Sequence, residues 1–196
     1  MPVDTLCARC GIPVSPPLHL CAACAIRAPA FDIARALGLY LAGPDLLNPL
    51  ARSVRALKFH GHRAAAASLG AALGSLLPLP AGALVVPVPL HPSRLRERGY
   101  NQALLLARAL GRAAQLRVAV RALVRRRATP SQAHLDAAAR RANLAGAFAA
   151  PAPLDGATIV LVDDVLTTGA TADACARTLR AAGAARVLVL TVGRTP

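Results

Sequence analysis

The residues best suited to chemistry in this chain stand together near its C-terminal end. Four apolar residues, 159–162, run into the adjacent acids Asp163 and Asp164, and a loop rich in threonine and glycine follows at 167–171. Adjacent residues of a strand point to opposite faces, so one acid can face a ligand while the other turns toward backbone or metal. Carboxylates accept hydrogen bonds from sugar hydroxyls, and a loop that opens a helix binds phosphate through backbone N–H groups and the helix dipole. The pattern therefore predicts a sugar-phosphate site at a strand end, where open α/β sheets bind ligands.

Two other interpretations compete for the acidic pair. Apolar strands ending in Asp-Asp also occur in phospho-receiver domains, where the acids bind magnesium and most of the domain follows them. Here only residues 165–196, 32 in all, follow Asp164, which argues against that class. Acids that merely cap a strand–helix turn would not need the run Thr-Thr-Gly-Ala-Thr, so phosphate binding is favoured.

Four cysteines near the N-terminus form a second cluster. Cys7 and Cys10 are separated by two residues, Cys21 and Cys24 repeat that spacing, and ten residues lie between the pairs. Each pair can place two thiolates at about 2.3 Å from one zinc ion, closing a tetrahedral site. A redox pair or disulfides are the alternatives. In so short a segment zinc would supply most of the folding free energy, whereas Cys175 is expected to be a small packing residue.

Several segments together resemble one protein family. Residues 160–171 resemble the phosphoribosyl pyrophosphate (PRPP) motif of the type I phosphoribosyltransferases. With the four cysteines and with residues 57–63, 86–102 and 132–143, the chain resembles the ComF family, which is associated with DNA uptake in competent bacteria. These segments span nearly the whole chain. Where many type I enzymes carry a second glycine, this chain has Ala170, which is small and compatible with a helix start.

The resemblance implies a set of site residues. Asp163 and Asp164 would contact the ribose hydroxyls and act as the catalytic residues. The 5′-phosphate would be held by five consecutive residues: Thr167, Thr168, Gly169, Ala170 and Thr171. The pyrophosphate would be held by the loop after the first core strand, at Pro89, Leu90, His91, Arg94 and Arg98. Lys58 is a candidate phosphate contact because the ComF pattern has a lysine there, and an ordinary surface lysine is the alternative.

The reaction implied is displacement of pyrophosphate at the anomeric carbon through an oxocarbenium-like state. Mg²⁺ would accompany PRPP and neutralise the leaving group. The arginines at 125–127 open a segment where type I enzymes carry a flexible loop that closes over the substrate. The same arginines could instead contact a nucleic acid backbone.

The elements that must position these residues alternate along the chain. The sequence predicts strands over 84–88, 118–124, 158–162 and 186–192, helices over 101–115 and 171–182, and a polar loop after the first of these strands. A weak strand over 34–41 and a helical region over 49–77, interrupted near Gly61, precede them, and a short helical piece is expected over 136–143.

This series predicts an α/β fold: a mostly parallel sheet with flanking helices, as in type I phosphoribosyltransferases, plus a small N-terminal four-cysteine zinc ribbon. The expected division is a zinc-ribbon module at 1–28, a bridging or hood region at 29–80 and the phosphoribosyltransferase-like domain at 81–196.

Composition adds a strong positive charge. The formal net charge is +14, and Lys58 is the only lysine among 23 basic residues. An excess of arginine suits bidentate phosphate contacts. No apolar run approaches the roughly 18 to 20 residues of a membrane span, so no membrane insertion is expected. The N-terminus lacks a secretory signal pattern, which indicates a cytoplasmic protein whose thiols stay reduced.

Two functions from different classes follow. The first is an enzyme that binds PRPP with Mg²⁺ and transfers its ribosyl phosphate. The second is a non-catalytic competence factor that handles single-stranded DNA together with competence proteins, its PRPP site being regulatory or vestigial. An aromatic content of only 3% weakens the case for base stacking in the second role.

Overall fold

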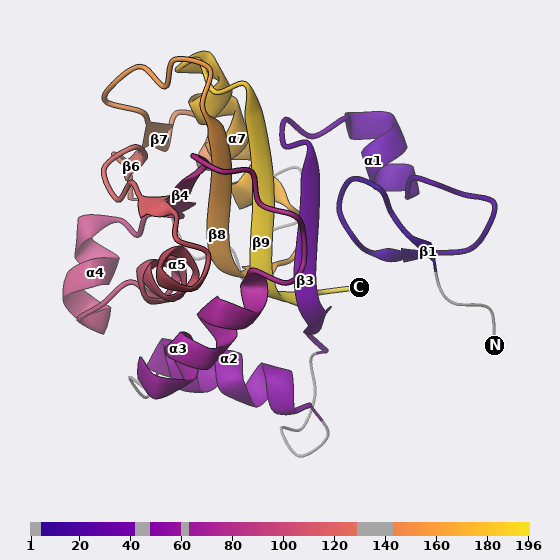
Figure 1. The fold of residues 1–196 in the computed structure, drawn as a ribbon, viewed down its shortest axis with the longest axis horizontal. Helices are drawn as coiled ribbons and strands as arrows, with labels where there is room; N and C mark the ends of the chain where they lie inside the picture. Colours follow the sequence, from indigo (N-terminus) through magenta and orange to yellow (C-terminus); the bar gives the residue numbers. More distant parts are fainter. Residues whose placement is uncertain (1–4, 42–47, 60–62, 129–142) are drawn as a thin grey trace.

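A computed structural model describes residues 5–41, 48–59, 63–128 and 143–196, except the side chains of residues 58, 59, 63 and 64. Within this part, five strands form one sheet in the order β3-β9-β8-β4-β5, and all neighbouring pairs are parallel (Figure 1). Their bounds are β3 Ile33–Leu39, β9 Arg186–Arg194, β8 Thr158–Leu166, β4 Leu84–Pro87 and β5 Arg117–Val118. The predicted α/β class, with a parallel sheet between helices, is confirmed.

The two central strands are apolar almost throughout because helices cover both faces of the sheet. Side chains alternate along β8, so that Val160 and Val162 enter one core and Ile159 and Leu161 the other. The first core lies under three helices, α2 Pro49–Phe59, α3 Arg63–Leu73 and α5 Gln102–Ala113. The second lies under α7, Ala170–Ala181, which returns the chain from β8 to β9.

The connections of β4 and β8 leave these neighbouring strands in opposite directions. From β4 the chain passes over one face through α5 to β5, and from β8 it passes over the other face through α7 to β9. A crevice outside the carboxyl ends of two such strands is where doubly wound sheets bind ligands. The acidic pair and the basic segment after β4 both begin at this edge.

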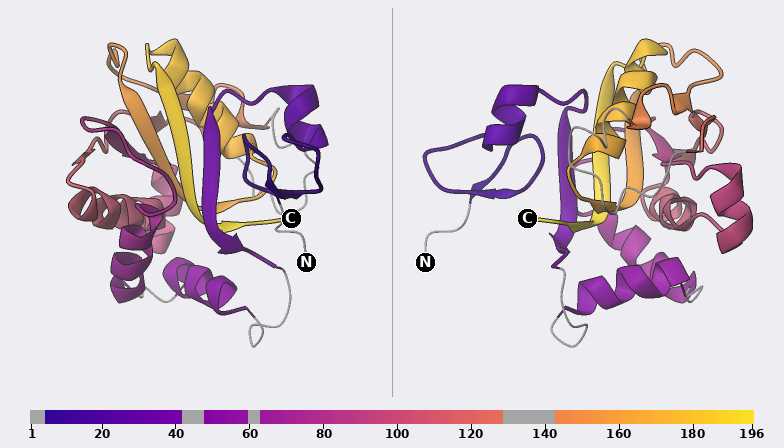
Figure 2. Two further views of the ribbon diagram at one scale, coloured as in Figure 1. Left: turned by 45° about the vertical axis from the view of Figure 1, so that its right-hand side comes forward. Right: turned by 180° about the vertical axis from the view of Figure 1, so that it is seen from behind.

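The N-terminal module lies beside β3 at the sheet edge, as the two views of Figure 2 show. It contains the short antiparallel strands β1 Thr5–Leu6 and β2 Pro13–Val14 and the helix α1 Ala22–Arg27. Backbone and side chain both dock it: the N–H of Ala34 donates to the carbonyl of Arg9 at 2.6 Å, and Arg35 Nη1 donates to the carbonyls of Cys7 and Ala8. The proposed division at residues 28 and 80 stays a prediction, and β3 is part of the main sheet.

Two local predictions were wrong. The strand expected over 118–124 is not formed: β5 shares only residue 118 with it, and a turn closed by the N–H of Ala122 and the carbonyl of Ala119 then leads to β6, Val124–Arg125. β5 pairs only with Leu84 and Val85 of β4 before the chain turns away. β6 pairs instead with β7, Phe148–Ala149, which the sequence did not suggest.

The polar loop expected after β4 contains a helix, α4 Pro92–Arg98. His91 caps its N-terminus by accepting a hydrogen bond from Ser93 N at 3.2 Å, and proline occupies the first turn, where it costs no hydrogen bond. Gly99 ends the helix with φ +79°, a conformation that glycine adopts without strain. The charged residues between these two caps favour a helical conformation. In the sequence, however, the combination of charge and proline indicated a loop.

The remaining predicted elements agree with the structure where it describes them. The interrupted helical region became α2 and α3, with residues 60–62 outside the described part. Most of the helical piece expected over 136–143 also lies outside it. No helix among the described residues is long and apolar enough to span a bilayer.

Candidate functional site

The acidic pair lies inside β8 rather than after it, because the strand continues to Leu166. Asp163 faces the core under α7 and lines a small pocket together with Thr167, Gly169 and Thr171. Asp164 faces the α5 side and is only 5% exposed. Each carboxylate accepts a hydrogen bond from the following backbone N–H, at 2.9 and 2.8 Å respectively. The predicted division of the two acids between opposite faces is therefore what the strand geometry produces.

The predicted phosphate loop, residues 167–171, joins β8 to α7. Gly169 has φ +79° and stands at the N-cap, so α7 begins with its amide end toward the loop. Thr167 and Thr168 are exposed, and Thr168 Oγ1 accepts a weak hydrogen bond from Ala170 N at 3.4 Å. The pocket, about 20 Å³, has room for about one water. A phosphate is larger, so it would sit at the mouth of the pocket, beside Thr167.

A buried amide connects the acidic pair to the basic segment. Gln102, in the first turn of α5 and 5% exposed, donates from Nε2 to Asp164 Oδ2 at 3.4 Å. Its Oε1 accepts from Arg98 Nη1 at 2.9 Å. Gln102 thus links a residue predicted for pyrophosphate to one predicted for ribose. Sequence reasoning missed it, although a glutamine among apolar helix positions just after an asparagine N-cap is a usable signal.

Residues around Gln102 fix the segment after β4. Asn101 accepts from Ala103 N at 2.9 Å and donates to the carbonyl of Val88 at 3.0 Å. The hydroxyl of Tyr100 donates to the carbonyl of Leu57 in α2. These contacts hold Pro89 and Leu90 at the carboxyl end of β4, next to the acidic strand.

The residues predicted to bind pyrophosphate include the N-cap of α4 and two arginines within that helix. His91 is the N-cap of α4, with Nδ1 also 2.8 Å from Ser93 Oγ. Arg94 is exposed and pairs with Glu97 at 2.9 Å, an ion pair in water that contributes little stability. Arg98 points back to Gln102. The structure therefore brings Arg98 toward the acidic pair through Gln102 and places Arg94 on the surface of α4.

Arg125, on β6, is the cation that the fold brings near Asp163. Burial lowers the pKa of Arg125, while Cys175 and Asp163 act to raise it, and the neighbouring Arg94 and Arg127 lower it further. Its guanidinium also lies over the ring of Phe148 at 5.6 Å. Arg94, Arg125 and Arg127 thus gather positive charge on the α4 side of the acidic strand. Lys58 is the second-last residue of α2, and its side chain lies outside the described residues, as do residues 129–132.

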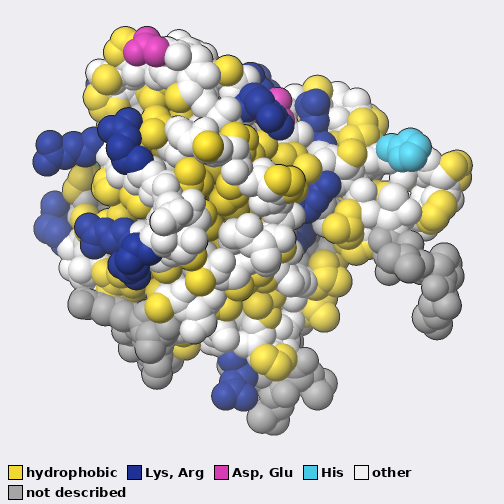
Figure 3. Space-filling view, in the orientation of Figure 1, with side chains coloured by type: hydrophobic (Ala, Val, Ile, Leu, Met, Phe, Trp, Pro, Cys, Tyr) yellow, Lys and Arg dark blue, Asp and Glu magenta, His cyan; other side chains and the backbone are white. Residues whose placement is uncertain are grey.

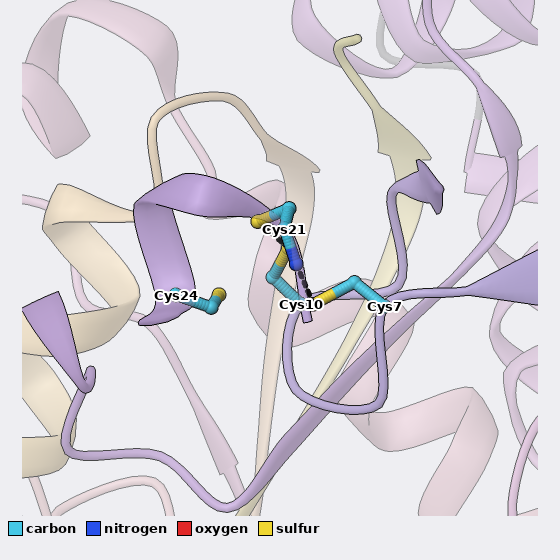
Figure 4. Close-up of side chains that lie close together, drawn as sticks. All are labelled: Cys7, Cys10, Cys21 and Cys24. Carbon is cyan, nitrogen blue, oxygen red and sulfur yellow. Dashed lines mark hydrogen bonds between the residues drawn. The ribbon is translucent and has the colours of Figure 1, made fainter. Parts of the chain in front are cut away.

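The four N-terminal cysteines converge from the loop between β1 and β2 and from α1 (Figure 4). All four sulfur atoms lie within 4.8 Å of one another. Cys10 Sγ and Cys21 Sγ are 3.7 Å apart, and sulfurs bound to one tetrahedral zinc would be separated by about 3.8 Å. This cluster could hold a structural zinc ion, as the spacing predicted.

The electrostatics of the cluster are uneven. Burial acts to raise the pKa of Cys7, but backbone hydrogen bonds from Cys10, Cys21 and Arg9 outweigh it and lower that pKa to about 6. Burial raises the pKa of Cys10 and of Cys24. A divalent cation would offset the cost of burying these thiolates, which fits a zinc site. Cys175 is fully buried on the inner face of α7, as expected for a packing residue.

A cavity of about 320 Å³ separates the cysteine cluster from the start of α7. Its walls include Thr168, Gly169 and Ala170 on one side and Cys10, Cys21 and Cys24 on the other. Arg194, at the end of β9, also lines it. The cysteine module and the predicted phosphate loop are therefore neighbours in space, although about 140 residues separate them in the chain.

Together these elements place carboxylates, threonine hydroxyls, a helix N-terminus and arginines at one sheet edge. Such a set can bind a ligand that carries both hydroxyls and phosphates. The cysteine cluster, which could hold a structural zinc ion, is separate from this set and lies at the side of the sheet.

Known proteins with similar sequences identify the family of this chain. No protein-family model matches the chain. It is 34% identical to the DNA utilization protein YhgH of Salmonella typhi, over 97% of this chain and 85% of that protein, and equally to the protein of the same name from Escherichia coli K12. It is 30% identical to competence protein F of Haemophilus influenzae, over 96% of this chain and 84% of that protein. Identity at this level over nearly the full length shows common descent, and the chain belongs to the ComF family of competence and DNA-utilization proteins.

Proposed function

We propose that this protein binds PRPP at the carboxyl ends of β4 and β8 and transfers its ribosyl phosphate. The observation that carries the proposal is the topological switch point between these strands. There Gln102 links Asp164 of the acidic strand to Arg98 of the basic segment, and the threonine-rich loop follows the acidic strand. PRPP carries a 5′-phosphate, two ribose hydroxyls and a pyrophosphate, and each has a chemically suitable counterpart at this edge.

In this proposal the 5′-phosphate lies at the N-terminus of α7, against Thr167 and Thr168. Asp163, which lines the same pocket, accepts hydrogen bonds from the ribose hydroxyls. Asp164 is held by Gln102 and contributes negative charge beneath the sugar, which favours the oxocarbenium-like transition state. Arg98 and the exposed Arg94 supply positive charge for the pyrophosphate.

Mg²⁺, when bound with PRPP, would neutralise charge on the leaving pyrophosphate. It would bind mainly through diphosphate oxygens and water, as is usual for this ion. Asp163, only partly buried, is the carboxylate of the pocket that could add a ligand.

Calorimetric titration with PRPP and Mg²⁺ tests the proposal. Wild-type protein should bind, and Asp163→Asn should bind about tenfold or more weakly, because an amide replaces a charged acceptor of the sugar hydroxyls. Asp155→Asn is a matched control, since Asp155 is exposed in the turn before β8, at the other end of that strand. Absence of binding by the wild type at millimolar PRPP would sink the proposal.

A second candidate function, handling of single-stranded DNA, is favoured by an arginine-rimmed groove. Figure 3 shows basic side chains gathered over the side formed by α4 and β6. There a cavity of about 510 Å³ is lined by apolar residues and by Tyr100, Arg108 and Arg125. A basic rim for phosphates beside an apolar floor for bases suits a single strand. The names of the relatives, which concern DNA utilization and competence, point the same way.

The DNA hypothesis predicts binding that weakens steeply with salt. Oligonucleotide titrations at several salt concentrations should give a log–log slope that falls by about 0.7 for each phosphate contact removed. Arg108→Gln with Arg127→Gln should lower the slope by about 1.4, and the exposed Arg186→Gln at the start of β9 should leave it unchanged. A slope that is the same in all variants would assign DNA binding, if any, to another surface.

A further inference from the structure

One guanidinium touches both the cysteine cluster and the predicted phosphate loop. Arg194 ends β9 opposite Leu166, the last residue of β8. Its Nη1 donates to the carbonyl of Leu166 at 3.0 Å and to the carbonyl of Thr167. Its Nη2 lies 3.9 Å from Cys10 Sγ. The two ends of one planar group thus contact a zinc-ligand candidate and the first residue of the loop.

Other contacts join the same two parts. Ala30 N, just after the N-terminal module, donates to Asp173 Oδ1 in the first turn of α7 at 2.7 Å. The ring of Phe31 lies beside Gly169, 3.9 Å from where a Cβ would stand on that glycine. These contacts set the module against the start of α7. Arg194 differs from them because it reaches a sulfur of the metal site itself.

A metal bound to the cysteines would change the hydrogen bond that Arg194 makes with Cys10. Zinc fixes the position of Cys10 Sγ and keeps it a thiolate, which accepts a stronger hydrogen bond than a neutral thiol. Groups that hydrogen-bond to metal ligands are oriented by them and in turn orient the ligands. With both Nη atoms engaged, the guanidinium fixes the carbonyls at the point where the loop leaves β8.

We propose that Arg194 is a positioning residue that couples zinc binding in the N-terminal module to the conformation of loop 167–171. Zinc would then act on ligand affinity at the sheet edge without contacting the ligand, and by linkage the ligand would strengthen zinc retention. The effect on PRPP affinity rests on the proposed function, whereas the coupling of metal to loop does not.

Amide hydrogen exchange tests the coupling on the full-length zinc-loaded protein. Arg194→Gln should keep one zinc per chain but raise the exchange rate of the amides of residues 167–170 by about tenfold, the factor expected for losing one charge-assisted hydrogen bond. Arg186→Gln, at the other end of the same strand and exposed, is the matched control and should exchange like wild type. Core amides of β8, residues 159–162, should stay protected in both.

Removal of zinc provides the second part of the exchange experiment. Stripping zinc from the wild type should raise exchange at 167–170, and stripping it from Arg194→Gln should add little, because the connection is already broken. Loop protection retained in Arg194→Gln would overturn the proposal. Loss of β8 protection in that variant would also overturn it, since Arg194 would then be a general stability residue. A third contradicting result would be a zinc effect of equal size in both proteins.

Calorimetry on the same samples separates the two claims. If PRPP binds, its affinity should fall in Arg194→Gln and in zinc-stripped wild type but not in Arg186→Gln. If the wild type does not bind PRPP, the proposed function fails, and the exchange data still decide whether Arg194 couples metal to loop.

Discussion

Gln102 is the residue on which the geometry of the acidic pair depends. A carboxylate as buried as Asp164 needs hydrogen-bond donors, and Gln102 supplies one while its other end holds Arg98. The Gln102 amide thereby makes the position of the buried Asp164 depend on that of Arg98. A residue of this kind acts through the site residues rather than on a ligand.

Gln102→Met should therefore destabilise the fold. Methionine keeps the volume but leaves Asp164 without that donor, which should lower the free energy of unfolding by about 1–3 kcal/mol in urea titrations. Gln115→Met, in the exposed turn after α5, should change it by less than about 0.5 kcal/mol. Equal stability of the two variants would contradict the role assigned to Gln102.

At the scale of elements, we expect the N-terminal module to depend on a metal for its stability. Its two strands have two residues each and its helix has six, too little to bury a core of its own. Its buried interior consists largely of the cysteines themselves. A metal held by these cysteines would therefore contribute much of its folding free energy.

Metal analysis should find one zinc per chain, and Cys24→Ser should lose most of it, because three thiolates and a hydroxyl are a poorer ligand set. Cys175→Ala should retain the full amount, since Cys175 lies on the buried face of α7 and is not part of the cluster. Zinc retained in Cys24→Ser, or lost in Cys175→Ala, would contradict the four-cysteine site.

Close packing of α3 on α5 leaves no room for an added methyl group at Gly70. A Cβ on Gly70 would stand 2.5 Å from Ala109 Cβ and 2.6 Å from the carbonyl of Leu106. Gly70→Ala should therefore lower the unfolding free energy by about 1–3 kcal/mol. At Gly74 the atoms nearest to an added Cβ would be 3.3 Å or more away, so the control variant Gly74→Ala should be tolerated. A Gly70→Ala protein as stable as wild type would show that the helices move apart easily.

The sequence predicted the elements that carry strong periodicity or composition. Local pattern was enough to recognise four features: the strand with the acidic pair, α7, α5 and the four-cysteine cluster. The short strands β5, β6 and β7 were not, because two-residue strands are defined by their partners rather than by their own residues. The helix α4 was hidden because its caps, His91 and Gly99, enclose a segment whose charge resembles a loop.

The candidate site was predictable in its parts but not in its connections. Asp163, the phosphate loop and the basic segment follow from motif and resemblance, since each is contiguous in sequence. Contacts between distant segments, such as Gln102 to Asp164 or Arg194 to Cys10, depend on how the sheet is ordered. Strand order β3-β9-β8-β4-β5 could not be read from the chain, and that order places the cysteine module beside α7.

At the scale of the whole molecule, one sheet edge unites three segments that are far apart in the chain. The parallel order makes β4 and β8 neighbours and directs their loops into a common crevice. Basic side chains on α4 and β6 face the same side, which would attract a polyanionic ligand from solution. The central claim is that a single ligand, PRPP, contacts both the threonine loop and the basic segment.

Phosphorus NMR of PRPP with Mg²⁺ tests that claim most directly, because the 5′-phosphate and the diphosphate give separate resonances. Addition of wild-type protein should shift or broaden both. Thr168→Val should reduce the effect mainly at the 5′-phosphate, and Arg98→Gln mainly at the diphosphate. Resonances that stay unchanged with protein in excess would contradict the account, as would a response confined to the diphosphate, the result expected of an arginine-rich surface that binds polyphosphate alone.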